Sequence, residues 1–298
     1  MANLRDIRRR IKSVKSTSQI TKAMQLVAAA KMKKAQDQAL AGRNYADELN
    51  KVLTSLKQNV DEDAHPLLEK REGGKTLMLV ISTNKGLCGG LNTNLLKKVR
   101  EEADENTDFV TVGRKLRTSL AKSGETLVAD FEVSDPVPFS EARPIAKFLT
   151  DKFLSGEYNK IQVAFTNFVT TLRQDPWVTQ LLTIESDTLA EKRAYEGVGK
   201  GEIKETDVEA ATASDYIFEP SPEAVLDTLL PLYINFQVYQ MLVESLACEH
   251  SSRMVAMKSA TDNAEQMVKD LTLEYNKARQ AAITSELLEI TTAQKAME

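Results

Sequence analysis

Two long terminal stretches of this 298-residue chain contain almost no helix-breaking residues, and this constrains the fold most strongly. Between Ala2 and His65 there is no proline and only one glycine, Gly42, and between Leu232 and Glu298 there is neither. Because proline and glycine interrupt helices, their concentration in the middle of the chain predicts a long helix at each end. At about 1.5 Å per residue, each helix would be on the order of 80–100 Å long.

Apolar residues recur at helical spacing in both stretches. In the N-terminal stretch they are Leu4, Ile7, Ile11, Val14, Ile20, Met24, Val27, Leu49, Val52, Leu53, Leu56 and Val60, and in the C-terminal stretch Met254, Met257, Val268, Leu271, Tyr275, Ala278, Ala282 and Leu288. Intervals of three and four residues are typical of coiled-coil seams. The seam is irregular, since Ser18, Thr21 and Ala28 stand where a strong zipper would place large apolar residues. Compactness favours pairing of the two helices with each other.

The central part of the chain alternates between strand and helix patterns. The predicted strands are Thr76–Ser82, Phe109–Val112, Lys160–Phe165 and Trp177–Ile184. The predicted helices run from Asn92 to about Asp104, from Arg114 to Ser123, and from Glu141 to Leu154 with Pro144 in its first turn. Such alternation indicates βαβ units and a largely parallel sheet. The polar, glycine-containing segment from about Asp187 to Asp215 predicts a mobile loop.

We therefore expect an α/β fold in which the N- and C-terminal helices form a long antiparallel coiled coil and carry an inserted Rossmann-like α/β domain. The predicted segments are an N-terminal shaft helix over residues 1–65, the α/β domain over residues 75–217, and a C-terminal shaft helix over residues 221–298 that pairs with residues 1–65.

Charge is distributed unevenly along the chain. The net charge is −4, but residues 1–36 contain ten Lys and Arg residues and one acid, Asp6. This asymmetry predicts that the N-terminal segment meets an acidic partner, which by charge alone is a nucleic acid, an anionic lipid or an acidic protein surface. Residues 1–36 contain no aromatic residue for base stacking, so nucleic acid is disfavoured. A mitochondrial targeting peptide fits the composition, but the same positions must pack in the long helix.

Cysteine and histidine are too sparse for several common site types. Cys88 and Cys248 lie far apart, so we expect no disulfide framework and a reducing compartment. His65 and His250 have no metal-ligand spacing, so no metal is predicted. The most apolar stretch, residues 225–247, contains several polar and charged residues and is too polar to span a bilayer.

A glycine-containing turn is the one candidate for phosphate binding. Residues 84–92 (NKGLCGGLN) follow a predicted strand and precede a predicted helix, as phosphate-binding loops do. The turn matches neither GxGxxG nor the GK[ST] ending of a P-loop, which favours a structural turn with Cys88 buried in it. The acidic residues between Glu191 and Glu223 contain no pair singled out for acid–base work, so no catalytic residue and no cofactor are predicted.

Segments spread over nearly the whole chain resemble the gamma subunits of F-type ATP synthases. They are Asp6–Val14 (DIRRRIKSV), Gln19–Ala28 (QITKAMQLVA), Thr83–Asn92 (TNKGLCGGLN), Ser252–Ala264 (SRMVAMKSATDNA) and Tyr275–Thr284 (YNKARQAAIT). The resemblance implies a non-catalytic rotor shaft that couples ion-driven rotation of the c ring to ATP synthesis or hydrolysis at the beta subunits, and that regulates ATPase activity and ion flow.

The resemblance also implies partners and a location. In this family the shaft helices lie inside a ring of three alpha and three beta subunits, and the α/β domain contacts the epsilon subunit and the c ring. The expected location is peripheral, on the cytoplasmic side of the cell inner membrane, with no nucleic acid and no cofactor. The two-cysteine regulatory insert of chloroplast members has no counterpart here, which indicates a bacterial-type subunit.

Nine positions correspond to contact residues of the family. Contacts with the lever segment of beta are implied for Lys22 and Met24. Contacts with ring loops are implied for Arg253, Arg279, Gln280 and Thr284. A foot near the c ring and epsilon is implied for Tyr216, Phe218 and Glu219, although the family often has tyrosine where Phe218 stands.

Two other functions remain open at this stage. A nucleotide-binding enzyme with helical extensions would require a phosphate-binding signature at residues 86–90, and binding of ATP by the isolated chain would support it. A coiled-coil scaffold unrelated to rotation would have a strict heptad seam and would self-associate.

Overall fold

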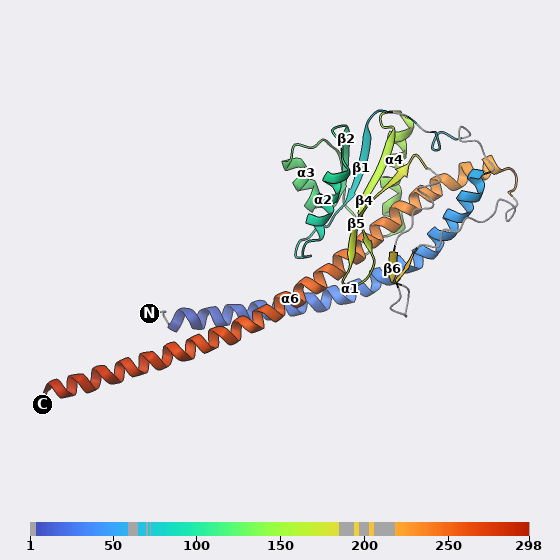
Figure 1. The fold of residues 1–298 in the computed structure, drawn as a ribbon. Helices are drawn as coiled ribbons and strands as arrows, with labels where there is room; N and C mark the ends of the chain where they lie inside the picture. Colours follow the sequence, from blue (N-terminus) through green and yellow to red (C-terminus); the bar gives the residue numbers. More distant parts are fainter. Residues whose placement is uncertain are drawn as a thin grey trace. The chain divides into compact units, whose positions relative to one another are not determined.

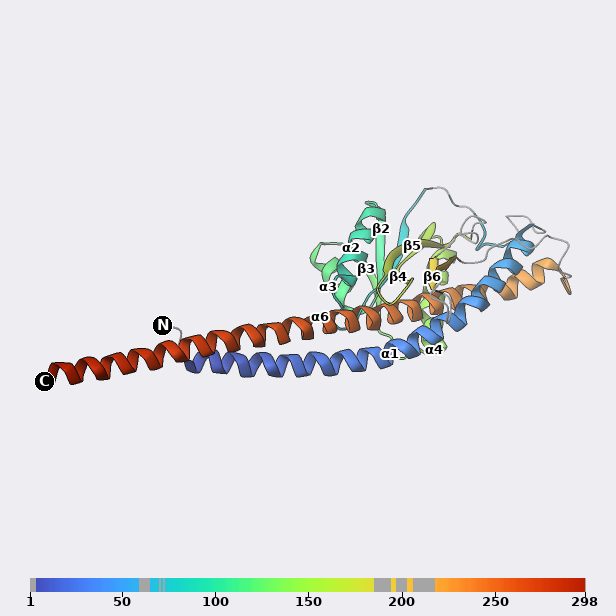
Figure 2. The ribbon, with the colours of Figure 1, turned by 60° about the horizontal axis from the view of Figure 1, so that its bottom comes forward.

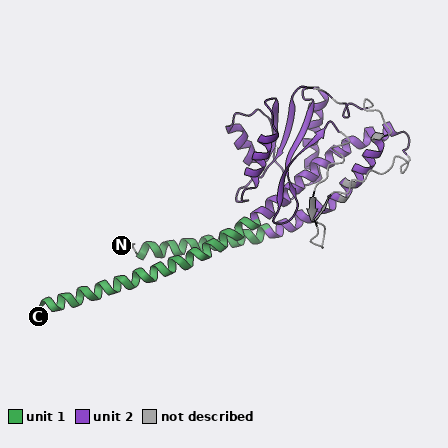
Figure 3. Ribbon diagram, in the orientation of Figure 1, with its two compact units in different colours: residues 1–28, 254–298 green, residues 29–253 purple. Residues whose placement is uncertain are grey.

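The computed structural model describes residues 4–58, 65–69, 71, 73–184, 194–196, 203–205 and 218–297 (Figure 1). The chain divides into two compact units (Figure 3). Unit 1 comprises residues 1–28 and 254–298, and unit 2 comprises residues 29–253. Residues 29–58 and 222–253 of the long helices belong to unit 2 and pack on its sheet core.

The two long terminal helices are present. Helix α1 spans Leu4–Gln58 and helix α6 spans Pro222–Met297. Helix α6 continues through Pro231 near its start. In unit 1, the N-terminal part of α1 lies beside the C-terminal part of α6 and runs in the opposite direction (Figure 2). The scarcity of glycine and proline in both stretches therefore predicted these elements correctly.

Unit 2 contains a five-stranded sheet in the order β3-β2-β1-β4-β5. Its strands are β1 (Thr76–Ile81), β2 (Thr107–Val112), β3 (Leu127–Phe131), β4 (Lys160–Phe168) and β5 (Gln174–Leu182). Strands β1 to β4 are parallel to one another, and β5 pairs with β4 antiparallel. The prediction of a largely parallel sheet is confirmed. Strand β3 was not predicted, because its LVADF run is short, only half-buried and interrupted by the exposed Asp130.

Helices cover both faces of this sheet (Figure 1). Helices α2 (Leu91–Glu102) and α3 (Arg114–Lys122) pack on Met78 and Val80 of β1. The alternate residues Leu77, Leu79 and Ile81 face the larger cluster, which is formed with α4 (Phe139–Leu154) and with the unit 2 parts of α1 and α6. Successive side chains of a strand point to opposite faces, so β1 supplies both cores.

Two details differ from the predictions. Helix α4 begins at Phe139, two residues before the predicted start, so Pro144 lies beyond the first turn rather than in it. The predicted loop from about Asp187 to Asp215 contains a short antiparallel pair, β6 (Ala194–Glu196) with β7 (Ile203–Glu205), and its other residues lie outside the described part of the chain. Three-residue strands are too short to produce a recognisable alternation.

A layer of buried polar residues joins α1 to α6 within unit 2. Arg43 Nε donates to Glu244 Oε1 at 2.9 Å, and Gln237 Nε2 contacts Asn50 Oδ1 at 3.4 Å. From Arg43 to Asn50 the residue number on α1 increases, whereas the partner on α6 changes from Glu244 to Gln237 and its number decreases. The two helices are therefore antiparallel here too. The single glycine of α1, Gly42, lies where a Cβ atom would collide with the carboxamide of Gln240.

Candidate functional site

The seam of unit 1 is lined by small and polar residues as well as apolar ones. The buried or half-buried positions of α1 are Leu4, Ile7, Ile11, Val14, Ser18, Thr21, Met24, Gln25 and Ala28, and those of α6 include Met257, Thr261, Ala264, Val268, Leu271, Tyr275, Ala278 and Ala282. At its centre, the hydroxyls of Thr21 and Thr261 are 2.7 Å apart. Small side chains let the helices approach closely with modest apolar burial, so stiffness depends on the length of the pairing.

The predicted lever-contact residues lie next to this seam on α1. Lys22 is exposed and Met24 is half-buried. The neighbouring apolar residues Ile20, Leu26 and Val27 are all more than half exposed.

Three of the predicted ring-contact residues lie on the last turns of α6. Arg279, Gln280 and Thr284 are exposed, and the Thr284 hydroxyl donates to the backbone carbonyl of Gln280 at 2.9 Å. The two helices are antiparallel and Thr21 lies opposite Thr261, so Leu4, the first residue of α1, lies opposite about residue 278 of α6. Helix α6 therefore extends past the end of α1 (Figure 2), and all of its side chains from Glu286 to Met297 are exposed.

Arg253 occupies a different environment from the other predicted ring contacts. It belongs to unit 2, is only 9% exposed, and donates to the carbonyls of Lys85 and Gly86 at 3.2–3.4 Å. Its guanidinium also forms an ion pair with Glu249 at 2.6 Å. Sequence reasoning missed this internal role, because nothing in the spacing joins a residue of the last helix to a turn more than 160 positions earlier.

The glycine turn is a structural element fixed from both sides. The hydroxyl of Ser252 donates to the carbonyl of Cys88 at 2.6 Å, and Asn92 Nδ2 donates to the hydroxyl of Thr83 at 2.9 Å. Cys88 is buried, as predicted. Cys248 is buried as well, and burial raises the pKa of its thiol well above the ordinary value.

Two of the predicted foot residues, Phe218 and Glu219, lie far from Arg253 within unit 2. Phe218 is half-buried and packs against the larger core cluster, whereas Glu219 is exposed. Tyr216 lies outside the described residues. Helix α6 rises about 1.5 Å per residue, so Pro222 and Arg253 are separated by roughly 45 Å along it. Within unit 2, Arg253 therefore does not share one site with Phe218 and Glu219.

A charged group on unit 2 links α1, the loop before α4, and α6. Lys31 Nζ lies 2.6 Å from Asp135 Oδ2, and His250 Nε2 lies 3.2 Å from the same oxygen. Burial raises the pKa of Asp135, but the hydrogen bond from Lys31 and the charges of His250 and Lys31 outweigh it and lower the pKa overall. Burial lowers the pKa of His250 below its ordinary value, outweighing the attraction of Asp135 and Glu249.

The free energy of unfolding should decrease as pH falls below about 6.5, the ordinary pKa of histidine. Because the pKa of His250 is lowered in the folded state, the unfolded chain binds more protons in this window, and stability rises with pH at no more than about 1.4 kcal/mol per pH unit. Asp135 destabilises the fold in the same direction at lower pH: its pKa is lowered in the folded state, so the unfolded chain binds more protons once the pH falls below the ordinary pKa of 3.8. Urea denaturation of His250→Asn at several pH values should show a shallower slope above pH 5. An unchanged slope would contradict the assignment, and His65→Asn controls for the other histidine.

The described residues contain neither a metal-binding cluster nor a membrane-spanning helix. No group of three or more His, Cys, Asp or Glu side chains in that part of the chain has a geometry that would hold a metal ion. None of the described helices combines the length and the apolar character needed to cross a membrane.

Known proteins match this chain along its length. A family model described as ATP synthase matches residues 3–297. A protein named ATP synthase gamma chain from Akkermansia muciniphila is 50% identical over 299 residues, and those of Methylacidiphilum infernorum and Opitutus terrae are 46% and 47% identical. These alignments cover 98–100% of both chains in each pair.

Solved structures share the fold at lower identity. A chain of the Euglena gracilis mitochondrial ATP synthase, from a structure of its OSCP/F1/c-ring portion, has a TM-score of 0.67 at 20% identity, with 99% of this chain and 94% of that chain covered. A chain of the Tetrahymena thermophila mitochondrial central stalk and c ring has a TM-score of 0.59 at 24% identity and covers 81% of this chain and 99% of that one. The full-length matches at 46–50% identity, together with the family model, place the chain in the ATP synthase gamma chain family.

Proposed function

We propose that this chain is the central rotor shaft of an F-type ATP synthase. The observation that carries the proposal is the 50% identity over the full length to a curated ATP synthase gamma chain, together with terminal helices that pair in a seam containing Thr21 and Thr261. The shaft turns with the c ring as ions cross the membrane, and its changing orientation drives the beta subunits through different nucleotide states. The chain thereby regulates both ATPase activity and ion flow.

The proposed role is mechanical, and catalysis belongs to other subunits. The glycine turn after β1 is occupied by internal hydrogen bonds to Ser252 and Arg253, which suits a structural turn. The predicted partners are three alpha and three beta subunits around the shaft, an epsilon subunit, and the c ring. In this assembly the chain is peripheral to the cell inner membrane, on its cytoplasmic side.

The contact with the beta lever is assigned to Lys22 and Met24. Ten basic residues in the first 36 positions would face an acidic surface through exposed, screened contacts. Exposed ion pairs contribute about 0–1 kcal/mol each. Weak, exchangeable contacts suit a part that must rotate against its surroundings, whereas fixed buried pairs would hold it in one orientation.

The other contacts follow the positions of the side chains. Arg279, Gln280 and Thr284 are exposed and are assigned to loops of the alpha–beta ring. Arg253 already bonds Lys85 and Gly86, so a contact between its guanidinium and a ring loop requires that these bonds exchange. The foot near epsilon and the c ring is assigned to Tyr216, Phe218 and Glu219.

Reconstitution tests the proposal directly. ATP hydrolysis is measured for this chain alone, for its cognate alpha and beta subunits, and for all three together. We expect the chain alone to be inactive and to bind no ATP, and the complete mixture to assemble and hydrolyse ATP. A chain that binds neither alpha nor beta, or that hydrolyses ATP by itself, would contradict the rotor assignment.

Replacing Met24 with lysine should impair coupling in the assembled enzyme. An added charge that gains or loses about 1 kcal/mol against the lever would change the relative populations of two rotational states about fivefold. The measurement is the ratio of ions transported to ATP hydrolysed in vesicles containing the complete enzyme. Ala23→Lys is the matched control, because it adds the same charge at an adjacent, exposed position. An unchanged ratio in Met24→Lys would count against a lever contact at this position.

A further inference from the structure

Two consecutive serines bond helix α6 to two different loops at the carboxyl edge of the unit 2 sheet. The hydroxyl of Ser251 donates to the backbone carbonyl of Thr171, in the connection between β4 and β5, at 2.6 Å. The hydroxyl of Ser252 donates to the backbone carbonyl of Cys88, in the glycine turn that follows β1, also at 2.6 Å. Strands β1 and β4 are parallel neighbours in the sheet, so the sheet positions both acceptors.

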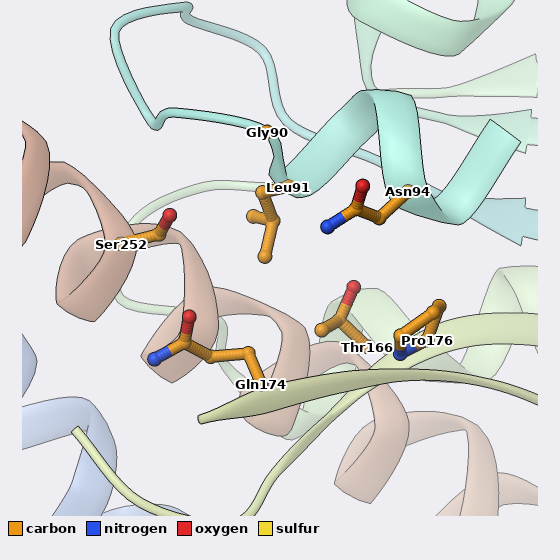
Figure 4. Close-up of a pocket in the computed structure, with 7 residues that line it drawn as sticks. All are labelled: Gly90, Leu91, Asn94, Thr166, Gln174, Pro176 and Ser252. Atoms are coloured by element: carbon orange, nitrogen blue, oxygen red, sulfur yellow. The ribbon is translucent and has the colours of Figure 1, made fainter. Parts of the chain in front are cut away.

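The two bonds leave the helix in different directions. Successive residues of an α-helix lie about 100° apart around its axis, because 3.6 residues make one turn. Figure 4 shows Ser252 on α6 between Gly90, at the end of the glycine turn, and Gln174, at the start of β5. The bonds of Arg253 go to the same turn as that of Ser252, whereas Ser251 bonds the other loop. A rotation of α6 that preserved one bond would therefore displace the other hydroxyl from its acceptor.

Apolar packing resists this rotation only weakly. The fully buried residues of α6 in the neighbouring apolar cluster are Ala247 and Cys248, whose side chains are short. Beside Ser252 the side chains leave a pocket of about 160 Å³ (Figure 4). Hydrophobic attraction is non-directional, whereas hydrogen bonds weaken steeply as their geometry departs from linear. The orientation of α6 about its axis therefore depends on the bonds of its side chains to the two loops.

The serines lie where α6 leaves the sheet. Unit 2 ends at Arg253, and α6 continues as one helix into unit 1. In the proposed rotor, the c ring turns the α/β domain and α6 is part of the shaft. Torque must then pass from the sheet to this helix, and it can pass only through contacts that resist rotation of the helix about its own axis.

We infer that Ser251 and Ser252 are positioning residues that transmit torque from the sheet of unit 2 to α6. They act through the backbone carbonyls of Thr171 and Cys88, and the inference rests on the proposed rotor function. Loss of both hydroxyls leaves the apolar core in place but allows α6 to turn relative to the sheet. ATP hydrolysis then continues, while the c ring follows the shaft incompletely.

Amide hydrogen exchange in the full-length chain tests the bonds themselves. In Ser251→Ala/Ser252→Ala, we expect the amides of residues 248–253 to exchange about thirtyfold faster, which is the combined net effect of two hydrogen bonds. Ser245→Ala is the matched control on the same helix. The Ser245 hydroxyl is buried and has no hydrogen-bond partner among the described residues, so its removal should not accelerate exchange.

The complete enzyme in vesicles tests the transmission of torque. With an ionophore that dissipates the ion gradient, the double variant should hydrolyse ATP at the parental rate, because no load acts on the shaft. Without the ionophore, it should transport fewer ions per ATP hydrolysed than the parent enzyme. Ser252→Thr keeps the hydroxyl and, like Ser245→Ala, should retain the parental ratio of ions to ATP.

The outcomes separate a torque contact from a merely structural one. A parental ratio in the double variant would overturn the inference, as would unchanged exchange or an equal loss of hydrolysis with and without the ionophore. If the double variant fails to fold, Ser251→Ala and Ser252→Ala are measured singly, each with about fivefold faster exchange expected and a lowered ratio. A parent enzyme that transports no ions would overturn the rotor assignment, and this inference with it.

Discussion

Replacing Arg43 with methionine is expected to lower the free energy of unfolding of unit 2 by about 3–5 kcal/mol. The guanidinium of Arg43 is 6% exposed and the carboxylate of Glu244 is 1% exposed, and the two lie 2.9 Å apart. Arg43 also donates to Asn167 Oδ1 and to the carbonyl of Phe168, so it joins α1, α6 and the end of β4. Removing it leaves a buried carboxylate without its counter-charge.

Urea denaturation followed by the fluorescence of the single tryptophan, Trp177 in β5, measures this loss. The double replacement of Arg43 and Glu244 by methionine should recover much of it, because an apolar pair avoids the cost of burying an unpaired charge. Arg9→Met is the control, since the Arg9–Asp6 pair is 82% and 56% exposed and should contribute at most about 0.5 kcal/mol. A double variant as unstable as Arg43→Met would show that the loss has another cause.

Gly113→Ala is expected to destabilise the sheet of unit 2 by about 2–6 kcal/mol. Gly113 connects β2 to α3 with φ of 92° and ψ of 144°, a conformation that is largely restricted to glycine and costs L-residues about 1–3 kcal/mol. A Cβ atom there would also lie 2.3 Å from the backbone oxygen of Ser82 at the end of β1. Backbone cannot move aside as a flexible side chain does, so displacement of the neighbouring strand adds about 1–3 kcal/mol.

Gly124→Ala separates the two contributions. Gly124 has φ of 80°, but no atom lies within 4 Å of a Cβ built there. It should therefore show only a conformational cost of about 1–2 kcal/mol. The excess in Gly113→Ala measures the collision with Ser82 together with the less favourable ψ of 144° at Gly113. Equal losses in the two variants, measured by urea denaturation, would contradict a close approach of β1 to Gly113.

Much of the fold follows from local sequence patterns. The absence of breakers predicted α1 and α6, and compact β-rich runs predicted β1, β2, β4 and β5 to within a few residues. These patterns succeed because helix and strand periodicity are local properties that burial reinforces. Strand β3 and the β6–β7 pair escaped prediction because they are short and carry little apolar alternation.

The candidate contact residues illustrate a different limit. Lys22, Arg279, Gln280 and Thr284 are exposed, as a contact with another chain requires. Arg253, drawn from the same kind of motif, turned out to bond the turn at Lys85 and Gly86. A motif specifies which side chain is present, but only the packing around it decides whether that side chain faces outward.

The sequence by itself determined the long terminal helices, the α/β middle and the family, because each depends on residue pattern along the chain. The tertiary structure decided which residues far apart in the chain meet: Arg43 with Glu244, Thr21 with Thr261, and the glycine turn with Ser252 and Arg253. It also placed Thr166 beside the start of α2. Such contacts depend on the register between helices and on strand order, which arise from the packing of the whole core and have no signature in any local stretch.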